Sequence, residues 1–209
     1  MFAKNMKIAA VALVTLFTAG FANAASLSVI GGATQNLGPG YSLGASTGLS
    51  NGSAVSAFAD GIGGGLFIVG SPATITMEFL GSETNNNNDV YELIGVPGIV
   101  FSTAATALYT KVTGVVGDAG LLPFGFASNS VTAAINGGFF SFGHAIAFAI
   151  ESPNSVIALF EDGDGNLDFD DMAIRISVVP LPASFWLFSA ALAGIVVLRA
   201  SKKRSSNTV

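Results

Sequence analysis

The stretch Thr74-Ile75-Thr76-Met77-Glu78-Phe79-Leu80 decides the fold, because polar and apolar side chains alternate along it. Its apolar side chains fall at every second position, at Ile75, Met77 and Phe79. A period of two is typical of a β-strand with one buried face. Met172–Val178 alternates in the same way, with Ile174, Ile176 and Val178 on one face. The two stretches predict strands that each have one apolar face.

Further strands are predicted wherever β-branched and aromatic residues gather between turn signals. We expect them at Leu27–Ile30, Gly65–Gly70, Thr106–Thr113, Ser130–Ile135 and Ser155–Phe160. Gly65–Gly70 and Thr74–Leu80 read as a strand pair around Ser71-Pro72, and residues 31–65 as loops with short strands. Many short strands at roughly ten-residue spacing favour an all-β fold, a β-sandwich or jelly roll over residues 25–178.

Charge is distributed unevenly along the chain. All thirteen acidic residues lie between residues 25 and 179, where Lys111 and Arg175 are the only basic ones, so this segment carries a net charge of −11 against −5 for the whole chain. Nucleic acid is therefore not an expected partner, since phosphate binding needs clustered Lys and Arg. The chain has no cysteine, which excludes disulfides and thiolate metal sites.

The first residues have the pattern of a secretory signal peptide. Lys4 and Lys7 form a short basic region, Ile8–Phe21 is apolar apart from two threonines, and Ala22-Asn23-Ala24 presents small residues to a signal peptidase. We expect residues 1–24 to be removed by cleavage after Ala24. The remaining chain would then face outward from the inner membrane.

The last thirty residues have the pattern of a membrane tail. Val179-Pro180-Leu181-Pro182-Ala183 leads into Ala183–Leu198, sixteen residues without a charge, and a transmembrane helix is expected at residues 183–199. Trp186 falls near the outer interface, where aromatic rings are favoured. The basic residues that follow should stay cytoplasmic by the positive-inside bias, together with a short tail at 205–209: Arg199, Lys202, Lys203 and Arg204.

Residues 179–204 resemble the PEP-CTERM sorting signals of Gram-negative bacteria, in the variant with VPLPA in place of the PEP core. The shared features are Val179–Ala183, the pair Trp186-Leu187, the small residues Ala193-Gly194 and the closing basic cluster. The resemblance implies recognition by an exosortase, a membrane-embedded cysteine peptidase, with processing near the proline motif. It also implies delivery from the periplasmic face to the cell surface or to the exopolysaccharide matrix. An ordinary anchor that is never processed is the alternative.

The segment Phe160–Asp171 holds six of the thirteen acidic residues. Its candidate oxygen ligands are Asp162, Asp164, Asn166, Asp168 and Asp171. Alternating carboxylates with intervening glycines suit Ca²⁺, which takes about 6–8 oxygen ligands. The segment is not an EF-hand, because Leu167 stands where the glycine is required and Ala173 where the glutamate is. A calcium loop between strands and a solvated hairpin tip both stay open. Asn85–Asn88 is interpreted as another hairpin tip.

The sequence does not predict an enzyme. His144 is the only histidine, and no G-x-S-x-G, H-E-x-x-H or P-loop pattern occurs. We therefore expect a non-catalytic envelope or matrix protein; a carbohydrate-binding or adhesive module is the alternative, and an envelope hydrolase is less favoured. The aromatic residues Phe139, Phe140, Phe142 and Phe148 are expected in the core. Exposed phenylalanines would favour carbohydrate binding, and a cleft holding His144 beside Glu151 or an aspartate would favour an enzyme.

Overall fold

The structure is a computed structural model, and it describes residues 25–70, 73–83, 86–92, 98–116, 118–163 and 168–180. These residues belong to one compact unit, Ala25–Pro180. The signal peptide, the transmembrane helix and the sorting residues from Leu181 to Arg204 lie outside the described residues. In the ranges given above, no helix is long and apolar enough to cross a membrane.

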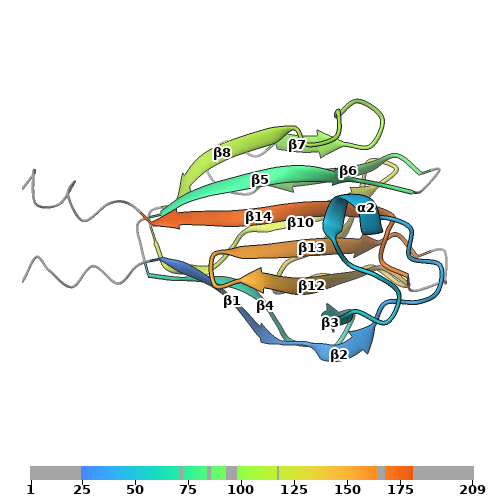
Figure 1. Cartoon of the computed structure of the whole chain (residues 1–209), viewed down its shortest axis with the longest axis horizontal. Coiled ribbons are helices and arrows are strands. Elements are labelled where there is room, and N and C mark those ends of the chain that lie inside the picture. Colours follow the sequence, from blue (N-terminus) through green and yellow to red (C-terminus); the bar gives the residue numbers. More distant parts are fainter. Residues whose placement is uncertain are drawn as a thin grey trace, which may run out of the picture. The chain divides into compact units, whose positions relative to one another are not determined.

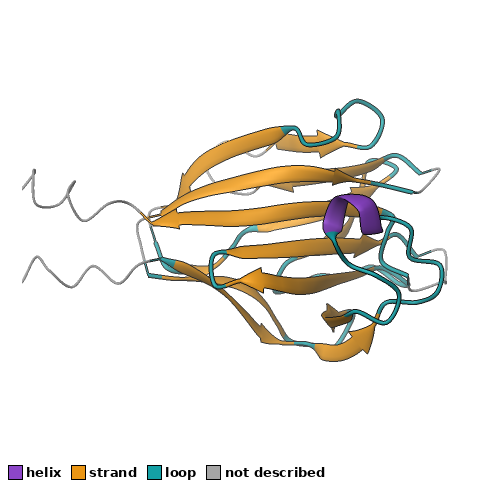
Figure 2. Ribbon diagram, viewed as in Figure 1, coloured by secondary structure: helices purple, strands orange, loops and turns teal. Residues whose placement is uncertain are grey.

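Antiparallel strands make up almost all of the unit (Figures 1 and 2). The largest sheet has seven strands, in the order β2 (Ala33–Asn36), β3 (Ala54–Phe58), β12 (Ala145–Ser152), β13 (Ser155–Glu161), β14 (Met172–Pro180), β5 (Ala73–Gly81) and β8 (Lys111–Val116). A four-stranded sheet has the order β11 (Val131–Ile135), β10 (Phe124–Ser128), β6 (Asn88–Glu92) and β7 (Gly98–Ser102). A three-stranded sheet consists of β1 (Ser26–Gly31), β4 (Gly64–Val69) and β9 (Gly120–Leu121). The all-β, sandwich-like fold expected from the sequence is confirmed.

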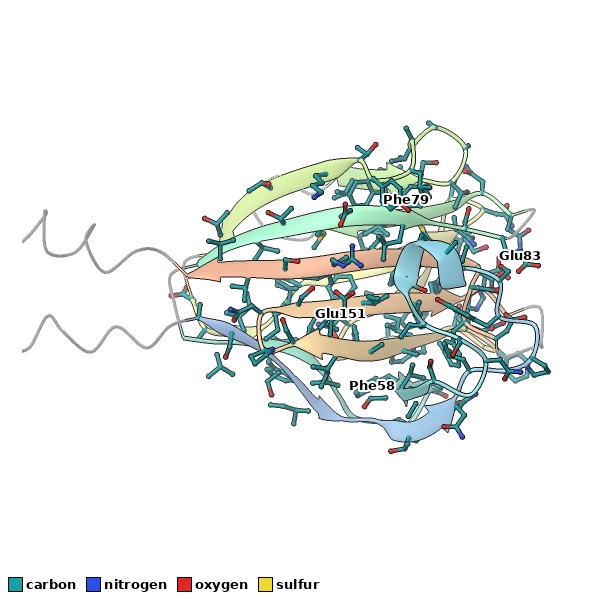
Figure 3. All side chains as sticks on the ribbon, in the orientation of Figure 1. Phe58, Phe79, Glu83 and Glu151 are labelled. Atoms are coloured by element: carbon teal, nitrogen blue, oxygen red, sulfur yellow. The ribbon has the colours of Figure 1, made fainter. Side chains whose placement is uncertain are left out.

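The main core lies between the seven-stranded sheet and the two smaller sheets. Phe126 of β10 stacks on Phe160 of β13, with ring centroids 4.8 Å apart. The alternating faces predicted for β5 and β14 both point into this core, through Ile75, Met77, Phe79, Ile174, Ile176 and Val178. Phe79, labelled in Figure 3, contacts Phe101 of β7 across the two layers. The period of two therefore identified the buried faces of both strands correctly.

Asn136 joins the two smaller sheets. It is buried, its Oδ1 accepts a hydrogen bond from the Leu66 backbone N–H over 2.8 Å, and its Nδ2 donates to the carbonyls of Leu66 and Leu122. Leu122 N–H also donates to Leu66 O over 3.0 Å. One buried side chain thus bonds three backbone groups of Leu66 and Leu122 from the segment that follows β11.

The other face of the seven-stranded sheet is partly covered by the segment that follows β2. This segment includes the single helical turn α2 (Gly44–Thr47), drawn in front of the sheet in Figure 1. Leu37, Tyr41, Leu43 and Leu49 pack on the alanine-rich outer face of β12 and on Ile157 and Leu159 of β13. Because β13 is buried on both faces, its sequence reads as a continuous apolar run.

Both basic side chains of the unit lie on this outer face, in a row across the sheet. Arg175 of β14 bonds Glu78 of β5 over 2.8 Å and Glu151 of β12 over 2.8 Å. Lys111 of β8 approaches Glu78 from the other side, at 3.3 Å. Figure 3 labels Glu151 on this row.

Both ends of the unit lie at one pole. Leu27 N–H donates to Pro153 O over 2.7 Å, and Val178 N–H donates to Asn154 O over 2.9 Å, so β1 begins and β14 ends beside the β12–β13 turn. We call this the chain-end pole. β14 is nine residues long, which corresponds to about 27 Å at roughly 3.3 Å per residue. Its first residue lies at the opposite pole, the loop pole, with Asp171 and the start of β12.

Two strand predictions need correction. β4 and β5 are strands, but they do not pair: β4 pairs with β1 and β9, and β5 with β14 and β8. The chain crosses from one layer to the other between them, which a local turn signal does not reveal. The strand predicted at Thr106–Thr113 begins only at Lys111, because residues 103–110 form turns and Tyr109 has a φ of 65°.

Candidate functional site

The acidic segment connects β13 to β14 at the loop pole, as the hairpin prediction required. Its described carboxylates are not solvated. Glu161, Asp162, Asp168, Asp170 and Asp171 are all buried, none more than 7% exposed. Burying charged groups is costly unless hydrogen bonds compensate, so a plain solvated tip does not describe these residues.

The compensating donors come from other loops and from the segment's own backbone. Asn88 Nδ2 donates to Asp162 Oδ2 over 3.0 Å, and Asn86 Nδ2 donates to the same oxygen over 2.8 Å. The Asp162 N–H donates to Asp171 Oδ2 over 2.7 Å, and the Phe169 N–H to Glu161 Oε2 over 3.3 Å. The segment is thus folded around its own carboxylates.

Two residues of the asparagine run, Asn86 and Asn88, donate hydrogen bonds within this network of carboxylates. Asn88 is fully buried at the start of β6 and also contacts Asp171 O, so the prediction that Asn85–Asn88 is a hairpin tip is wrong for Asn88. Asn85 lies outside the described residues. The physical reason is the neighbouring carboxylate, which is best satisfied by amide N–H donors.

Asp170 connects the acidic segment to the segment that follows β2 and covers the outer face of the seven-stranded sheet. Its Oδ2 accepts from the Ser42 N–H over 2.6 Å, and its carbonyl accepts from the Glu83 N–H over 3.0 Å. Figure 3 labels Glu83 at this pole. Burial raises the pKa of the Asp170 carboxyl above its ordinary value, and a side-chain hydrogen bond with Asp168 raises it further, against smaller lowering effects of Glu83 and Ser42.

The calcium prediction stays a prediction. Asp164 and Asn166 fall outside the described ranges. Among the residues that are placed, no three Asp, Glu or His side chains gather closely enough to hold a metal ion. Asp162, Asp168 and Asp171 lie in the same segment, but they do not by themselves form the ligand set.

A pocket of about 270 Å³ opens beside this segment at the loop pole. It is lined by polar side chains from four parts of the chain, with small apolar contributions: Asn86, Ser128, Asn129, Val131, Thr132, Ala133, Ser141, His144 and Asp162. Asn129 Nδ2 donates to Asn86 Oδ1 over 3.2 Å, and Asn86 in turn donates to Asp162. The pocket wall is therefore a connected row of amides that ends on a carboxylate.

The β10–β11 hairpin positions Asn129 at the pocket. Asn129 and Ser130 have φ of 50° and 66°, and they form the two-residue loop between the paired residues Ser128 and Val131. Two central residues with positive φ define a type I′ turn, which suits the right-handed twist of a hairpin. Asparagine tolerates this conformation better than most residues.

His144 is held rigidly in the pocket wall. Its ring lies over Phe160, with centroids 5.9 Å apart, and its Nδ1 contacts Ser141 Oγ at 2.8 Å and Phe142 O at 3.1 Å. A carbonyl can only accept, so the contact with Phe142 O is a hydrogen bond only in the tautomer that carries a proton on Nδ1. Ser141 Oγ donates its own proton to Ala133 O over 3.1 Å. In that tautomer the serine proton points away from the imidazole.

Two of the four phenylalanines expected in the core are exposed instead. Phe140 and Phe148 are buried, but Phe139 is 52% exposed and Phe142 is fully exposed. Phe142 lies between the pocket residues Ser141 and His144 in the chain. Phe140 pairs with Ala134 through a bridge that turns its ring inward, and the alternation of an extended chain turns Phe139 the other way.

Sequence analysis missed most of the pocket residues. His144, Asn86 and Asp162 were noted for other reasons, but Asn129, Thr132 and Ser141 carried no motif. The strand predicted at Ser130–Ile135 even included Ser130, which the structure places in the turn with Asn129. The chain matches no protein-family model, no curated protein and no solved structure.

Proposed function

We propose that the protein is an exported, non-catalytic component of the cell envelope or extracellular matrix, delivered through a PEP-CTERM-type tail that an exosortase recognises. The signal-peptide pattern at residues 1–24 and the proline motif followed by an apolar run and basic cluster at 179–204 carry this proposal. Acidic composition and the absence of cysteine agree with an exported domain that relies on its apolar core.

The arrangement of the unit supports display at a surface. Pro180, after which the tail continues, belongs to β14 and pairs with Ala73 at the chain-end pole. The pocket, the acidic segment and Phe142 belong to the loop pole. A domain tethered through Pro180 would therefore present its polar loops at the end away from the attachment point.

Carbohydrate binding is the second candidate function, and exposed aromatic rings favour it. Phe142 is fully exposed and Phe139 half-exposed, and both belong to the chain segment that contains the pocket residues Ser141 and His144. Exposed phenylalanine is unfavourable by about 1.5–3 kcal/mol relative to burial, so covering either ring with the apolar face of a ligand would be favourable.

Hydrolysis is disfavoured by the geometry of the only histidine. His144 does line a pocket with Asp162, which is the arrangement that would favour an enzyme. However, Ser141 Oγ lies within 3.1 Å of Ala133 O as well as 2.8 Å from His144 Nδ1, so the carbonyl competes with the imidazole for the hydroxyl proton whose transfer would activate a nucleophile. Glu151 is engaged by Arg175 on the outer face.

Cell fractionation with external protease treatment tests the main proposal. Full-length protein should be found in the envelope or matrix and should be digested from outside. Truncation after Pro180, which keeps β14 whole, should release the domain from the envelope, whereas deletion of residues 205–209 alone should leave its location unchanged. Envelope retention without residues 181–209 would contradict a tail-based mechanism.

A further inference from the structure

The pocket at the loop pole has the polar groups that a polyhydroxylated ring requires. Asn86, Asn129 and Thr132 offer amide and hydroxyl groups, and Asp162 offers a carboxylate. Hydroxyl groups of a sugar both donate and accept, so they pair with mixed sets of this kind. At about 270 Å³, the pocket is just below the range of roughly 300–1,000 Å³ that suits drug-sized ligands, which limits the occupant to about one ring.

The charges at and around the pocket restrict the class of sugar that it can bind. The pocket contains an acidic side chain, whereas both basic side chains of the unit, Lys111 and Arg175, are engaged with glutamates on the outer face of the seven-stranded sheet. The segment as a whole carries −11. An anionic sugar such as a uronic acid would be repelled, whereas a neutral or amino sugar would not.

An exposed aromatic residue, Phe142, belongs to the same loop as the pocket residues Ser141 and His144. Phe142 follows Ser141 directly in the chain, and its carbonyl oxygen lies 3.1 Å from His144 Nδ1, so its backbone lies at the pocket while its ring faces solvent. A pyranose has an apolar C–H face as well as hydroxyls on its rim. The C–H face can cover an exposed aromatic ring and remove it from water.

The exposure of Asn129, Val131 and Thr132 leaves one side of the pocket open to solvent. A sugar unit bound there need not be a free monosaccharide, because the chain on either side can continue outward. From these observations we propose that the pocket binds one neutral or amino-sugar unit of a polysaccharide, with Asn86, Asn129 and Asp162 on its hydroxyls and Phe142 on its C–H face.

This inference rests on carbohydrate binding, the second candidate function. Binding assays can distinguish failure of the proposed site from failure of carbohydrate binding as a whole. The protein purified from the envelope would be titrated with dextran, mannan and chitosan oligosaccharides, with alginate oligosaccharides as the anionic comparison. Phe142→Ala and Asn129→Gly should each weaken the strongest neutral or amino-sugar binding by about tenfold, the effect of losing one good contact. Asn129→Gly keeps the positive φ of the turn, and Ile99→Ala, a change of an exposed apolar residue on β7, should leave affinity unchanged.

Three results would overturn the inference. Retained affinity in both variants, with unchanged melting temperatures, would place the sugar site elsewhere and leave carbohydrate binding intact. Tighter binding of alginate than of the neutral and amino-sugar oligosaccharides would contradict the proposal of a neutral or amino-sugar ligand. Absence of binding to every oligosaccharide would remove the carbohydrate function as well, while surface delivery, measured by fractionation, would stand on its own.

Discussion

Asn88 and Asp162 are 74 positions apart in the chain, and the Asn88 side-chain amide donates to Asp162 Oδ2 over 3.0 Å. Both residues are buried. This contact joins the asparagine run to the acidic segment and links the four-stranded sheet to the seven-stranded one. Two stretches that look in the sequence like independent surface loops therefore belong to one buried polar network.

Removing the Asn88 amide should destabilise the protein. Hydrogen bonds to charged groups contribute about 1.5–3 kcal/mol each, so Asn88→Ala should lower the free energy of unfolding by about 2 kcal/mol in a denaturant titration. Asn36→Ala, at an exposed position of β2, should change it by less than about 0.5 kcal/mol. Equal effects of the two changes would mean that the contact contributes little.

Sequence reasoning identified the strands with one buried face because their alternation is local. β5 and β14 were predicted down to the residues that face the core. It did not find that β4 and β5 belong to different layers, since strand partners are chosen by packing across the whole unit. Nor did it find that Asn88 is buried, because the carboxylate that requires it lies far along the chain.

The pocket was hidden for the same reason. Asn129 is brought to Asn86 by the pairing of β10 with β6, and His144 is brought to Asp162 by the pairing of β12 with β13. Each residue alone has an ordinary structural explanation. Only the sheet register gathers them at one pole.

Phe160 should be far more important for stability than Phe142. Phe160 is fully buried between Phe126 and His144, and truncation of a buried phenylalanine costs about 3–5 kcal/mol. Phe160→Ala should therefore lower the unfolding free energy by that amount, or prevent folding, whereas Phe142→Ala should change it by less than about 0.5 kcal/mol. A large loss of stability in Phe142→Ala would show that its ring is packed rather than exposed.

Asp170 should make stability fall as pH rises. Its pKa is higher in the folded protein than in the unfolded chain, so the folded state binds the proton more tightly. This contribution is complete below the unfolded pKa and is lost as pH rises through the folded pKa. Asp170→Asn keeps an acceptor for the Ser42 N–H but cannot titrate. It should therefore reduce the fall in melting temperature between about pH 3 and pH 7. This window begins just below the ordinary aspartate pKa of about 3.5–4. An unchanged slope would contradict the assignment.

Calcium should stabilise the protein if residues outside the described ranges complete a site in the acidic segment. Asp168 Oδ1 is buried without a hydrogen-bond donor among the placed residues, and an oxygen of this kind suits a hard cation. EGTA should then lower the melting temperature, and Asp164→Ala should remove that sensitivity while Asp118→Asn, at an exposed position, keeps it. The absence of any EGTA effect on the unmodified protein would leave the segment as a self-bonded hairpin connection.

The most direct test of the account is the intact mass of the protein recovered from the cell surface or matrix, with both termini sequenced. We predict a chain that begins at Ala25 and ends between Pro180 and Ala183, because cleavage there leaves β14 whole and removes the membrane tail. A mature protein that begins at Met1 and ends at Val209 would contradict delivery through its two ends.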